Sequence, residues 1–183
     1  MAGNSYAAAS SQTKFSVVRY GNVIGSRGSI VELLLKNKSL PSVPITALEM
    51  TRFWIYYEQA CRLVLFALGE MVGGEIFIPK VPSMKLVDLV QAIVPEARQE
   101  VVGIRPGEKM HETLVTEQEA RHAVELDDYF VVLPEFSSWA EGQYDKYYAR
   151  GRALGDGFSF DSHTNQHKLT IGELQAIIAN LSL

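Results

Sequence analysis

The stretch "VVRYGNVIGSRGS", residues 17–29, decides how this chain of 183 residues is interpreted. An apolar, β-branched run ends in polar side chains and three glycines, Gly21, Gly25 and Gly28. This pattern is typical of a buried strand that ends in a loop. Apolar residues at helical spacing follow Ser29, which suits a helix N-cap. Because ligands of open α/β sheets bind at the carboxyl ends of strands, this is a candidate binding loop.

A glycine turn without any ligand explains the same residues, with Arg19 and Arg27 solvated. The spacing of the glycines alone does not decide between a turn and a binding loop.

Strands and helices alternate along the rest of the chain. We expect strands over 14–20, 50–55, 75–81, 99–104 and 127–133, and helices over 29–38, 58–71, 83–94 and 168–181. Ser83 would cap the third helix, and Thr170 with Glu173 would form a capping box. Residues 39–49 read as an irregular connection, 105–116 as a turn that opens into a helix, and 135–160 as a loop. The alternation predicts an α/β fold whose short strands do not complete a doubly wound sheet.

Composition excludes several classes of protein. A net charge of −4 and a pI of about 5.6 give no general attraction to nucleic acid or to an anionic membrane. The single cysteine, Cys61, excludes an intramolecular disulfide and is expected to be buried. No histidine has the spacing of a metal ligand, so no metal site is expected, and His111 reads as a surface or capping residue. No apolar run is long enough for a membrane span, and we expect a cytoplasmic protein.

Two further polar positions join the glycine loop. Arg52 in "MTRFWI" lies among aromatic residues, and Arg105 in "GIRPGEKMHE" leaves a strand three residues before Glu108. A guanidinium offers a planar donor fork to a phosphate, so Arg52 and Arg105 together would suit a diphosphate. Alternatively, the stem of Arg52 covers the aromatic cluster. Structural pairing of Arg105 with Glu108 alone is the alternative at the third position.

Four motifs carry a family resemblance: "RYGNVIGSRGS", "MTRFWI", "GGEIFIPKVPSMKLVDL" and "GIRPGEKMHE". In this order the chain resembles the inverting nucleotide-sugar 4,6-dehydratases of the extended short-chain dehydrogenase/reductase superfamily. Among these it is most similar to the type that acts on UDP-N-acetylglucosamine in pseudaminic acid biosynthesis. The resemblance implies that NADP takes hydride from sugar carbon 4, water is lost across carbons 5 and 6, and hydride returns to carbon 6. The product would be a 4-keto-6-deoxy sugar with inverted carbon 5.

The resemblance also implies roles for individual residues. Asn22 would contact the sugar nucleotide, Val23 would face the nicotinamide of NADP, and Arg27, Gly28, Ser29 and Ile30 would line the substrate site. Arg52 and Arg105 would bind the diphosphate. Glu108 would bind the ribose or a neighbouring group.

This chain departs from the family pattern in one respect. It contains no G-x-x-G-x-x-G cofactor loop, and no tyrosine is followed four residues later by lysine, the pair that does the proton chemistry in the family. We therefore expect the C-terminal half of such an enzyme, in which residues 1–13 are a remnant of the preceding helix or linker. Residues 14–183 would form a substrate-binding lobe with the last strands of the Rossmann half. It would not bind NADP alone.

Three functions follow from these expectations. The chain is the UDP-sugar-binding lobe of a dehydratase, inactive alone, or a truncated structural protein, or a half-enzyme completed by a separate N-terminal half. The strand over 14–20 would have lost a neighbour, and exposed strand edges tend to pair, so a homo-oligomer joined there is possible. Whether the chain alone is an enzyme stays open.

Overall fold

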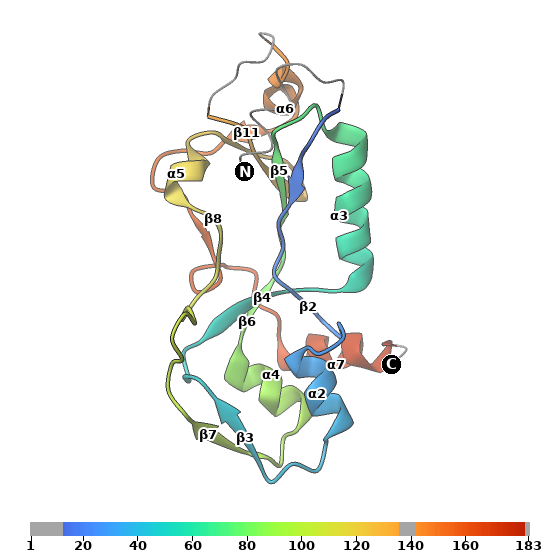
Figure 1. Ribbon diagram of the computed structural model, residues 1–183, viewed down its shortest axis with the longest axis vertical. Coiled ribbons are helices and arrows are strands. Elements are labelled where there is room, and N and C mark those ends of the chain that lie inside the picture. The colour runs from blue at the N-terminus through green and yellow to red at the C-terminus, as the bar shows by residue number, and fades with distance from the viewer. Residues whose placement is uncertain (1–12, 136–141, 182–183) are drawn as a thin grey trace. The chain divides into compact units, whose positions relative to one another are not determined.

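The computed structural model describes residues 13–135 and 142–181, and the expected remnant at 1–13 lies almost wholly outside them (Figure 1). The chain is a mixed α/β protein with several small sheets, as the alternation of strands and helices predicts. It divides into two compact units. Unit 1 comprises residues 1–20, 58–80 and 114–160, and unit 2 comprises residues 21–57, 81–113 and 161–183.

Unit 1 is built on a five-stranded sheet in the order β1-β5-β10-β9-β11. Its strands are β1 (Val17–Val18), β5 (Ile76–Pro79), β10 (Tyr129–Val132), β9 (Ala123–Glu125) and β11 (Arg152–Ala153). The first pair is parallel, and the other neighbours are antiparallel. Its helices are α3 (Tyr57–Glu70), α5 (Glu117–Ala120) and α6 (Asp145–Arg150). The loop expected over 135–160 is therefore wrong where α6 and β11 lie.

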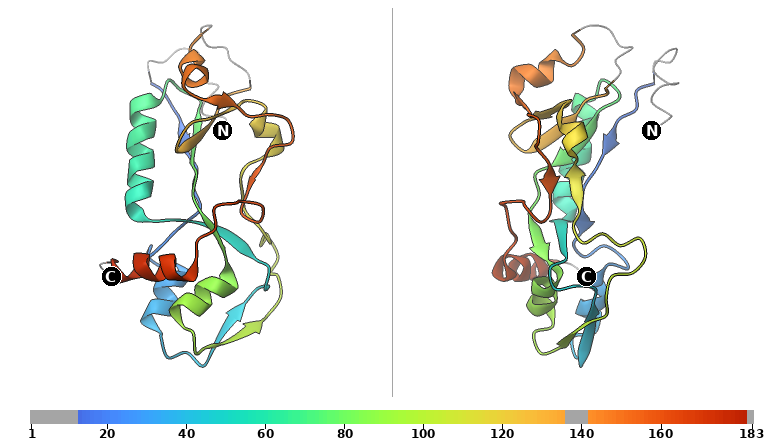
Figure 2. Two further views of the ribbon diagram at one scale, coloured as in Figure 1. Left: turned by 180° about the vertical axis from the view of Figure 1, so that it is seen from behind. Right: turned by 90° about the vertical axis from the view of Figure 1, so that its left-hand side faces the viewer.

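The core of unit 1 forms where α3 meets the sheet (Figure 2). Leu63 and Ala67 of α3 pack with Phe77 of β5, Val131 of β10 and the buried ring of Tyr147. Cys61, on the same helix, is only half-buried, so its expected full burial is wrong. The strand expected over 14–20 is reduced to β1, because only Val17 and Val18 are in ladder register with β5.

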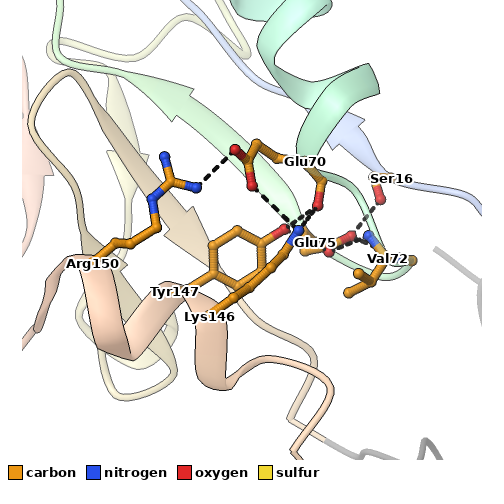
Figure 3. Close-up of polar contacts among 8 residues, drawn as sticks. Ser16, Glu70, Val72, Glu75, Lys146, Tyr147 and Arg150 are labelled. Carbon is orange, nitrogen blue, oxygen red and sulfur yellow. Dashed lines mark hydrogen bonds and ion pairs between the residues drawn. The ribbon is translucent and has the colours of Figure 1, made fainter.

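Glu75 is a fully buried carboxylate in unit 1. Its Oε2 accepts from Ser16 Oγ at 2.5 Å and Gly73 N at 2.9 Å, and its Oε1 accepts from Val72 N at 2.7 Å and Tyr147 Oη at 2.9 Å (Figure 3). Burial, followed by the charge of Glu75, raises the pKa of the Tyr147 phenol. One carboxylate thus joins the segment before β1, the turn after α3, and α6.

Arg19 forms an ion pair with Glu119, so the alternative in which its side chain is only solvated is wrong. Its Nη2 and Nη1 lie 2.8 and 3.0 Å from the two carboxylate oxygens of Glu119, and Nη1 also donates to the carbonyl of Leu114 at 2.8 Å. Glu119 in addition closes a capping box with Thr116 at the start of α5. A cation and its partner that are 100 residues apart in sequence leave no local signal.

The described part of unit 2 contains two small sheets and three helices. The strands β2 (Asn22–Val23), β4 (Thr51–Ile55) and β6 (Ser83–Lys85) form one sheet, and β3 (Ser42–Ile45) pairs with β7 (Arg98–Val101). Strands β2 and β4 are parallel, β4 and β6 antiparallel, and β3 and β7 parallel. The helices are α2 (Ile30–Lys36), α4 (Leu86–Ile93) and α7 (Ile171–Ala179), while β8 (Thr113–Val115) and β12 (Phe160–Asp161) lie at the boundaries of the units. Trp54, Leu89 and Leu174 are at the centre of its core.

Two helix starts in unit 2 are confirmed by their caps. Ser29 Oγ accepts from the Glu32 amide at the start of α2, and Thr170 forms the expected capping box with Glu173 at α7. The cap expected at Ser83 is wrong. Ser83 is a fully buried strand residue whose amide donates to His167 O and whose carbonyl accepts from Leu169 N, so the helix begins three residues later.

The secondary structure expected for residues 39–49 and 105–116 is also wrong. The irregular connection at 39–49 contains β3, in which Pro44 is tolerated although it lacks an N–H. The helix expected within 105–116 does not form, and Thr113–Val115 is a strand. Residues before this strand form hydrogen bonds with partners that are distant in sequence. For example, the Glu112 amide donates to the Ser162 hydroxyl.

Gly69 gives a stability prediction. It is exposed near the end of α3, and a Cβ at this position would meet no atom within 4 Å. Because glycine costs helix stability relative to alanine, we expect Gly69→Ala to raise the free energy of unfolding by about 0.5 kcal/mol. Urea unfolding followed by circular dichroism measures the change. A loss of stability would show that this end of α3 is not helical in solution.

Candidate functional site

The central strand of the larger sheet in unit 2 carries Arg52. Its Nη1 donates to the carbonyl oxygens of Thr51 at 2.7 Å and Met110 at 3.2 Å, and its Nε lies 3.5 Å from Glu112 Oε1. Only 15% of the Arg52 side chain is exposed. These partners hold the guanidinium in one orientation, so that it would lose little conformational freedom on binding an anion.

Arg105 and Glu108 form a tight turn in which Gly107 has a φ of +86°. The Glu108 amide donates to the Arg105 carbonyl at 3.0 Å, and the Arg105 amide donates to Glu108 Oε2 at 3.1 Å. Thr46 Oγ1 also donates to this oxygen, at 3.2 Å. The turn fixes the carboxylate, while the Arg105 side chain is exposed and has no ion-pair partner among residues 13–135 and 142–181.

The surroundings of Glu108 favour its charged form. Its pKa is lowered, first by the amide of Arg105, then by the Thr46 hydroxyl and by the charges of Arg105 and Arg52. Arg52 and Arg105, for which the sequence suggested a diphosphate clamp, lie in the same unit as Glu108, which the resemblance assigns to the ribose or a neighbouring group. We use "clamp" below for Arg52, Arg105 and Glu108.

The glycine loop lies along β4 and continues past its end. Asn22 and Val23 are half-buried and in register with Trp54 and Ile55. The Ile24 amide donates to the Ile55 carbonyl, so the loop leaves β4 at the end opposite Arg52. The three residue steps from Arg52 to Ile55 correspond to about 10 Å of strand. Asn22 and Val23 therefore lie nearer the clamp along the strand direction than the predicted binding residues Arg27, Gly28, Ser29 and Ile30.

The loop itself is not arranged as a phosphate cradle. Gly25 and Gly28 have φ angles of +77° and +75°, but the Gly28 amide donates to the Glu32 carboxylate, and Ser29 caps α2. Lys36, followed by the Gly28 amide, lowers the pKa of Glu32, which keeps a negative charge at the loop. Such a charge would repel a pyrophosphate, so the residues described do not fit the phosphates of NADP.

Sequence reasoning missed a buried hydrogen-bond network beside the clamp. Thr51 Oγ1 lies 2.8 Å from His111 Nδ1 and 2.7 Å from Ser162 Oγ, and Thr51 and Ser162 are almost completely buried. His111 is half-buried and lies in no helix, so the helix start expected at this residue is wrong. Burial, followed by the charge of His163, lowers the pKa of His111. No local sequence pattern predicts such a network, because Thr51 is 60 residues from His111 and 111 residues from Ser162.

Glu112 is a second residue that the sequence did not reveal. Its Oε2 accepts from the Phe53 amide at 3.2 Å, while its other oxygen faces Arg52. Burial raises the pKa of Glu112, opposed by the Phe53 amide and the Arg52 charge. The Glu112 carboxylate thus helps to restrain the Arg52 guanidinium electrostatically.

The described residues form neither a metal site nor a membrane-spanning helix. Residues 13–135 and 142–181 hold no grouping of three or more His, Cys, Asp or Glu side chains placed to bind a metal ion. Within the same ranges, no helix has the length and apolar character that crossing a membrane requires.

Comparison with known proteins supports the resemblance. The chain is 40% identical over 182 residues to the UDP-N-acetylglucosamine 4,6-dehydratase (inverting) of Campylobacter jejuni serotype O:2, a match covering 93% of this chain and 53% of that protein. It is 31% identical to the UDP-glucose 4-epimerase of Rickettsia canadensis, covering 93% of this chain and 51% of the epimerase. The X-ray structure of Pen from Bacillus thuringiensis superposes with a TM-score of 0.78 at 34% identity, covering 96% of this chain and 52% of Pen.

The chain spans about half the length of the curated relatives it matches, and in the Campylobacter enzyme the match is to the C-terminal part. The family model described as "Polysaccharide biosynthesis protein" matches residues 1–134. This range includes the glycine loop, Arg52, Arg105 and Glu108. The chain therefore belongs to the polysaccharide biosynthesis protein family and is related to its inverting UDP-N-acetylglucosamine 4,6-dehydratases.

Proposed function

We propose that this chain binds UDP-N-acetylglucosamine or a closely similar nucleotide sugar as part of a 4,6-dehydratase of surface polysaccharide biosynthesis. The observation that carries this proposal is the clamp, in which an exposed guanidinium, Arg105, and a restrained one, Arg52, lie in the same unit as the fixed carboxylate of Glu108. Its residues are those that the family resemblance assigns to the substrate.

The clamp suits a nucleoside diphosphate chemically. Arg52 and Arg105 supply two delocalised cations with planar donor groups, which match the oxygens of two adjacent phosphates. Glu108 is charged and can only accept hydrogen bonds, so it would take them from a ribose hydroxyl rather than from the phosphates. In a protein with a net charge of −4, this local pair of cations directs the anion to one place.

The other assigned residues would extend the site along β4. Asn22 would contact the nucleotide sugar, Val23 would face the nicotinamide side, and the segment 27–30 would line the sugar. Arg27 is exposed and Ile30 half-buried, so both are accessible to a ligand.

We further propose that the chain has no dehydratase turnover by itself. It lacks the Tyr-x-x-x-Lys pair that would move the hydroxyl proton, and its one glycine loop at a helix start carries Glu32. The parts that supply these groups, in the same polypeptide or in a second one, would complete the enzyme, and NADP would be held there. We place the protein in the cytoplasm, where nucleotide sugars are made. Purified chain that formed product from UDP-N-acetylglucosamine and NADP would contradict this proposal.

Binding of UDP tests the clamp. We expect Arg105→Ala to weaken UDP binding about 10- to 100-fold, the loss typical of a hydrogen bond to a charged group. Arg105→Lys should lose part of that affinity, because it keeps the charge but not the planar fork. Isothermal titration calorimetry with the whole chain measures the dissociation constants.

Arg98 provides the matched control for Arg105. It is also an exposed arginine of unit 2, but it pairs with Glu100 on β7. Arg98→Ala should leave the UDP dissociation constant unchanged. If Arg98→Ala and Arg105→Ala raise the UDP dissociation constant equally, Arg105 acts only through general electrostatic attraction and the clamp is contradicted.

A second function is favoured by the edge of the unit 1 sheet. Strand β1 pairs with β5 on one side only among the described strands, and Phe15 and Val17 are 50% and 40% exposed. An unpaired edge with exposed apolar side chains can add a strand from another chain. A homo-oligomer joined at β1, or a complex with an N-terminal half, would use this edge. Sedimentation showing a strict monomer would count against the homo-oligomer.

A further inference from the structure

We infer that Thr51 and Ser162 are positioning residues of the clamp: their hydroxyl groups hold the segment that carries Arg105 and Glu108 against β4, which carries Arg52. This inference rests on the proposed function for its ligand but not for its geometry. Ser162 is distant in sequence from every clamp residue, and it lies outside the four motifs quoted above.

The two hydroxyl groups join three segments of unit 2. Thr51 Oγ1 bonds to the His111 ring and to Ser162 Oγ, at 2.8 and 2.7 Å. Ser162 Oγ also accepts from the Glu112 amide at 2.8 Å, and the Ser162 amide donates to the Glu112 carbonyl at 2.8 Å. Thr51 is 3% exposed and Ser162 0%, so water does not replace a lost partner.

The clamp segment depends on such bonds because it has no regular structure of its own. No helix or strand is formed between β7 and β8, that is, over residues 102–112. The segment is tied to β4 by the Thr51 amide, which donates to Met110 O at 3.2 Å, and by the Phe53 amide, which donates to Glu112. The hydroxyl network adds a hydrogen bond between Thr51 and the His111 ring and one from the Glu112 amide to the Ser162 side chain. Among the described residues, these are the only hydrogen bonds that the His111 ring and the Glu112 amide form with side chains.

Lys168 holds the other end of the network. Its Nζ donates to the carbonyl oxygens of Ser162 at 3.1 Å and His163 at 2.8 Å, and to Ser83 Oγ at 3.2 Å on β6. The His163 ring packs on the His111 ring with centroids 4.4 Å apart. The turn that presents Ser162 is therefore itself fixed, and a fixed partner can position the clamp segment.

The test removes one hydroxyl and keeps the shape of the side chain. We expect Thr51→Val to raise the UDP dissociation constant of the whole chain about tenfold, because misplaced binding groups lose much of their affinity. Thr51→Ser, which keeps the hydroxyl, should restore binding close to the original value. In an Arg105→Ala background, Thr51→Val should have little further effect, since the group that it positions is gone.

A matched control separates positioning from a general loss of stability. Thr170→Val is the same substitution at the capping box of α7 in the same unit, where no clamp residue is in contact with the hydroxyl. It should lower the thermal midpoint without changing the UDP dissociation constant. If Thr170→Val and Thr51→Val weaken UDP binding alike, or if Thr51→Ser fails to rescue, the positioning role is overturned.

Hydrogen exchange tests the geometry without any ligand. The amides of Arg105 and Glu112 are bonded to Glu108 and Ser162, and we expect Thr51→Val to speed their exchange about tenfold while Thr170→Val leaves it unchanged. Unchanged exchange in Thr51→Val would overturn the inference. Failure of the original chain to bind UDP would overturn the proposed function instead, and exchange would still decide the positioning role.

Discussion

Replacing the buried carboxylate, Glu75→Gln, should destabilise the chain by about 3–5 kcal/mol, the cost of breaking a buried charged network. Each oxygen of Glu75 accepts one backbone amide, Gly73 or Val72, and one side-chain hydroxyl (Figure 3). A glutamine amide places an NH₂ group where one oxygen was. The hydroxyl there can reverse its bond, but the backbone amide cannot, so either orientation leaves one buried N–H without an acceptor.

Glu70 is the matched control for this prediction. It lies in the same cluster and pairs with Arg150 at 2.7 Å and Lys146 at 3.2 Å, but its side chain is 23% exposed. Because partly exposed ion pairs contribute little, Glu70→Gln should cost at most about 1 kcal/mol. Urea unfolding of both variants, monitored by circular dichroism, gives the free energies. Similar midpoints for the two would show that the Glu75 network does not hold unit 1 together.

The second large loss of stability is expected on substitution of Gly21, which lies in the glycine-rich stretch 17–29. A Cβ at this position would lie 2.5 Å from both the Cβ and the carbonyl oxygen of Phe53, a fully buried residue of β4. Backbone atoms cannot yield as a flexible side chain can, so β2 would have to move away from β4. We expect Gly21→Ala to cost about 3 kcal/mol, at the upper end for overpacking.

Gly28→Ala separates this close approach from backbone strain. Gly28 has a φ of +75°, but a Cβ there would meet no atom within 4 Å. Its cost should be about 1 kcal/mol, the penalty for a side chain in the left-handed region. Denaturant unfolding measures both variants, and exchange of the Ile24 amide reports whether β2 has left β4. A Gly21→Ala protein as stable as Gly28→Ala would contradict the tight packing of these strands.

Elements determined by neighbouring residues were predictable. The starts of α2 and α7 follow from Ser29 and Thr170, whose caps involve residues three positions along the chain. Strand β4 and helix α3 follow from runs of apolar residues with a clear period. The motifs around Arg52 and Arg105 identified the family, because their residue types stand in the same order as in its members.

Elements determined by distant partners were not predictable. Ser83 looks like a helix cap in sequence, yet it forms a strand because His167 and Leu169 pair with its backbone. The stretch after Arg105 has the pattern of a helix start, but its bonds go to β4 and to Ser162. In both cases hydrogen bonds to distant segments outweigh a local preference worth about 1 kcal/mol.

The sequence by itself determined the α/β class and the family and predicted the residues of the clamp, since these depend on residue type and on spacing along the chain. Only the tertiary structure decided that Thr51, His111 and Ser162 form one network. It also decided that the glycine loop leaves β4 away from Arg52. The physical reason is that a buried polar group must find a partner wherever the fold brings one, however distant in sequence that partner is.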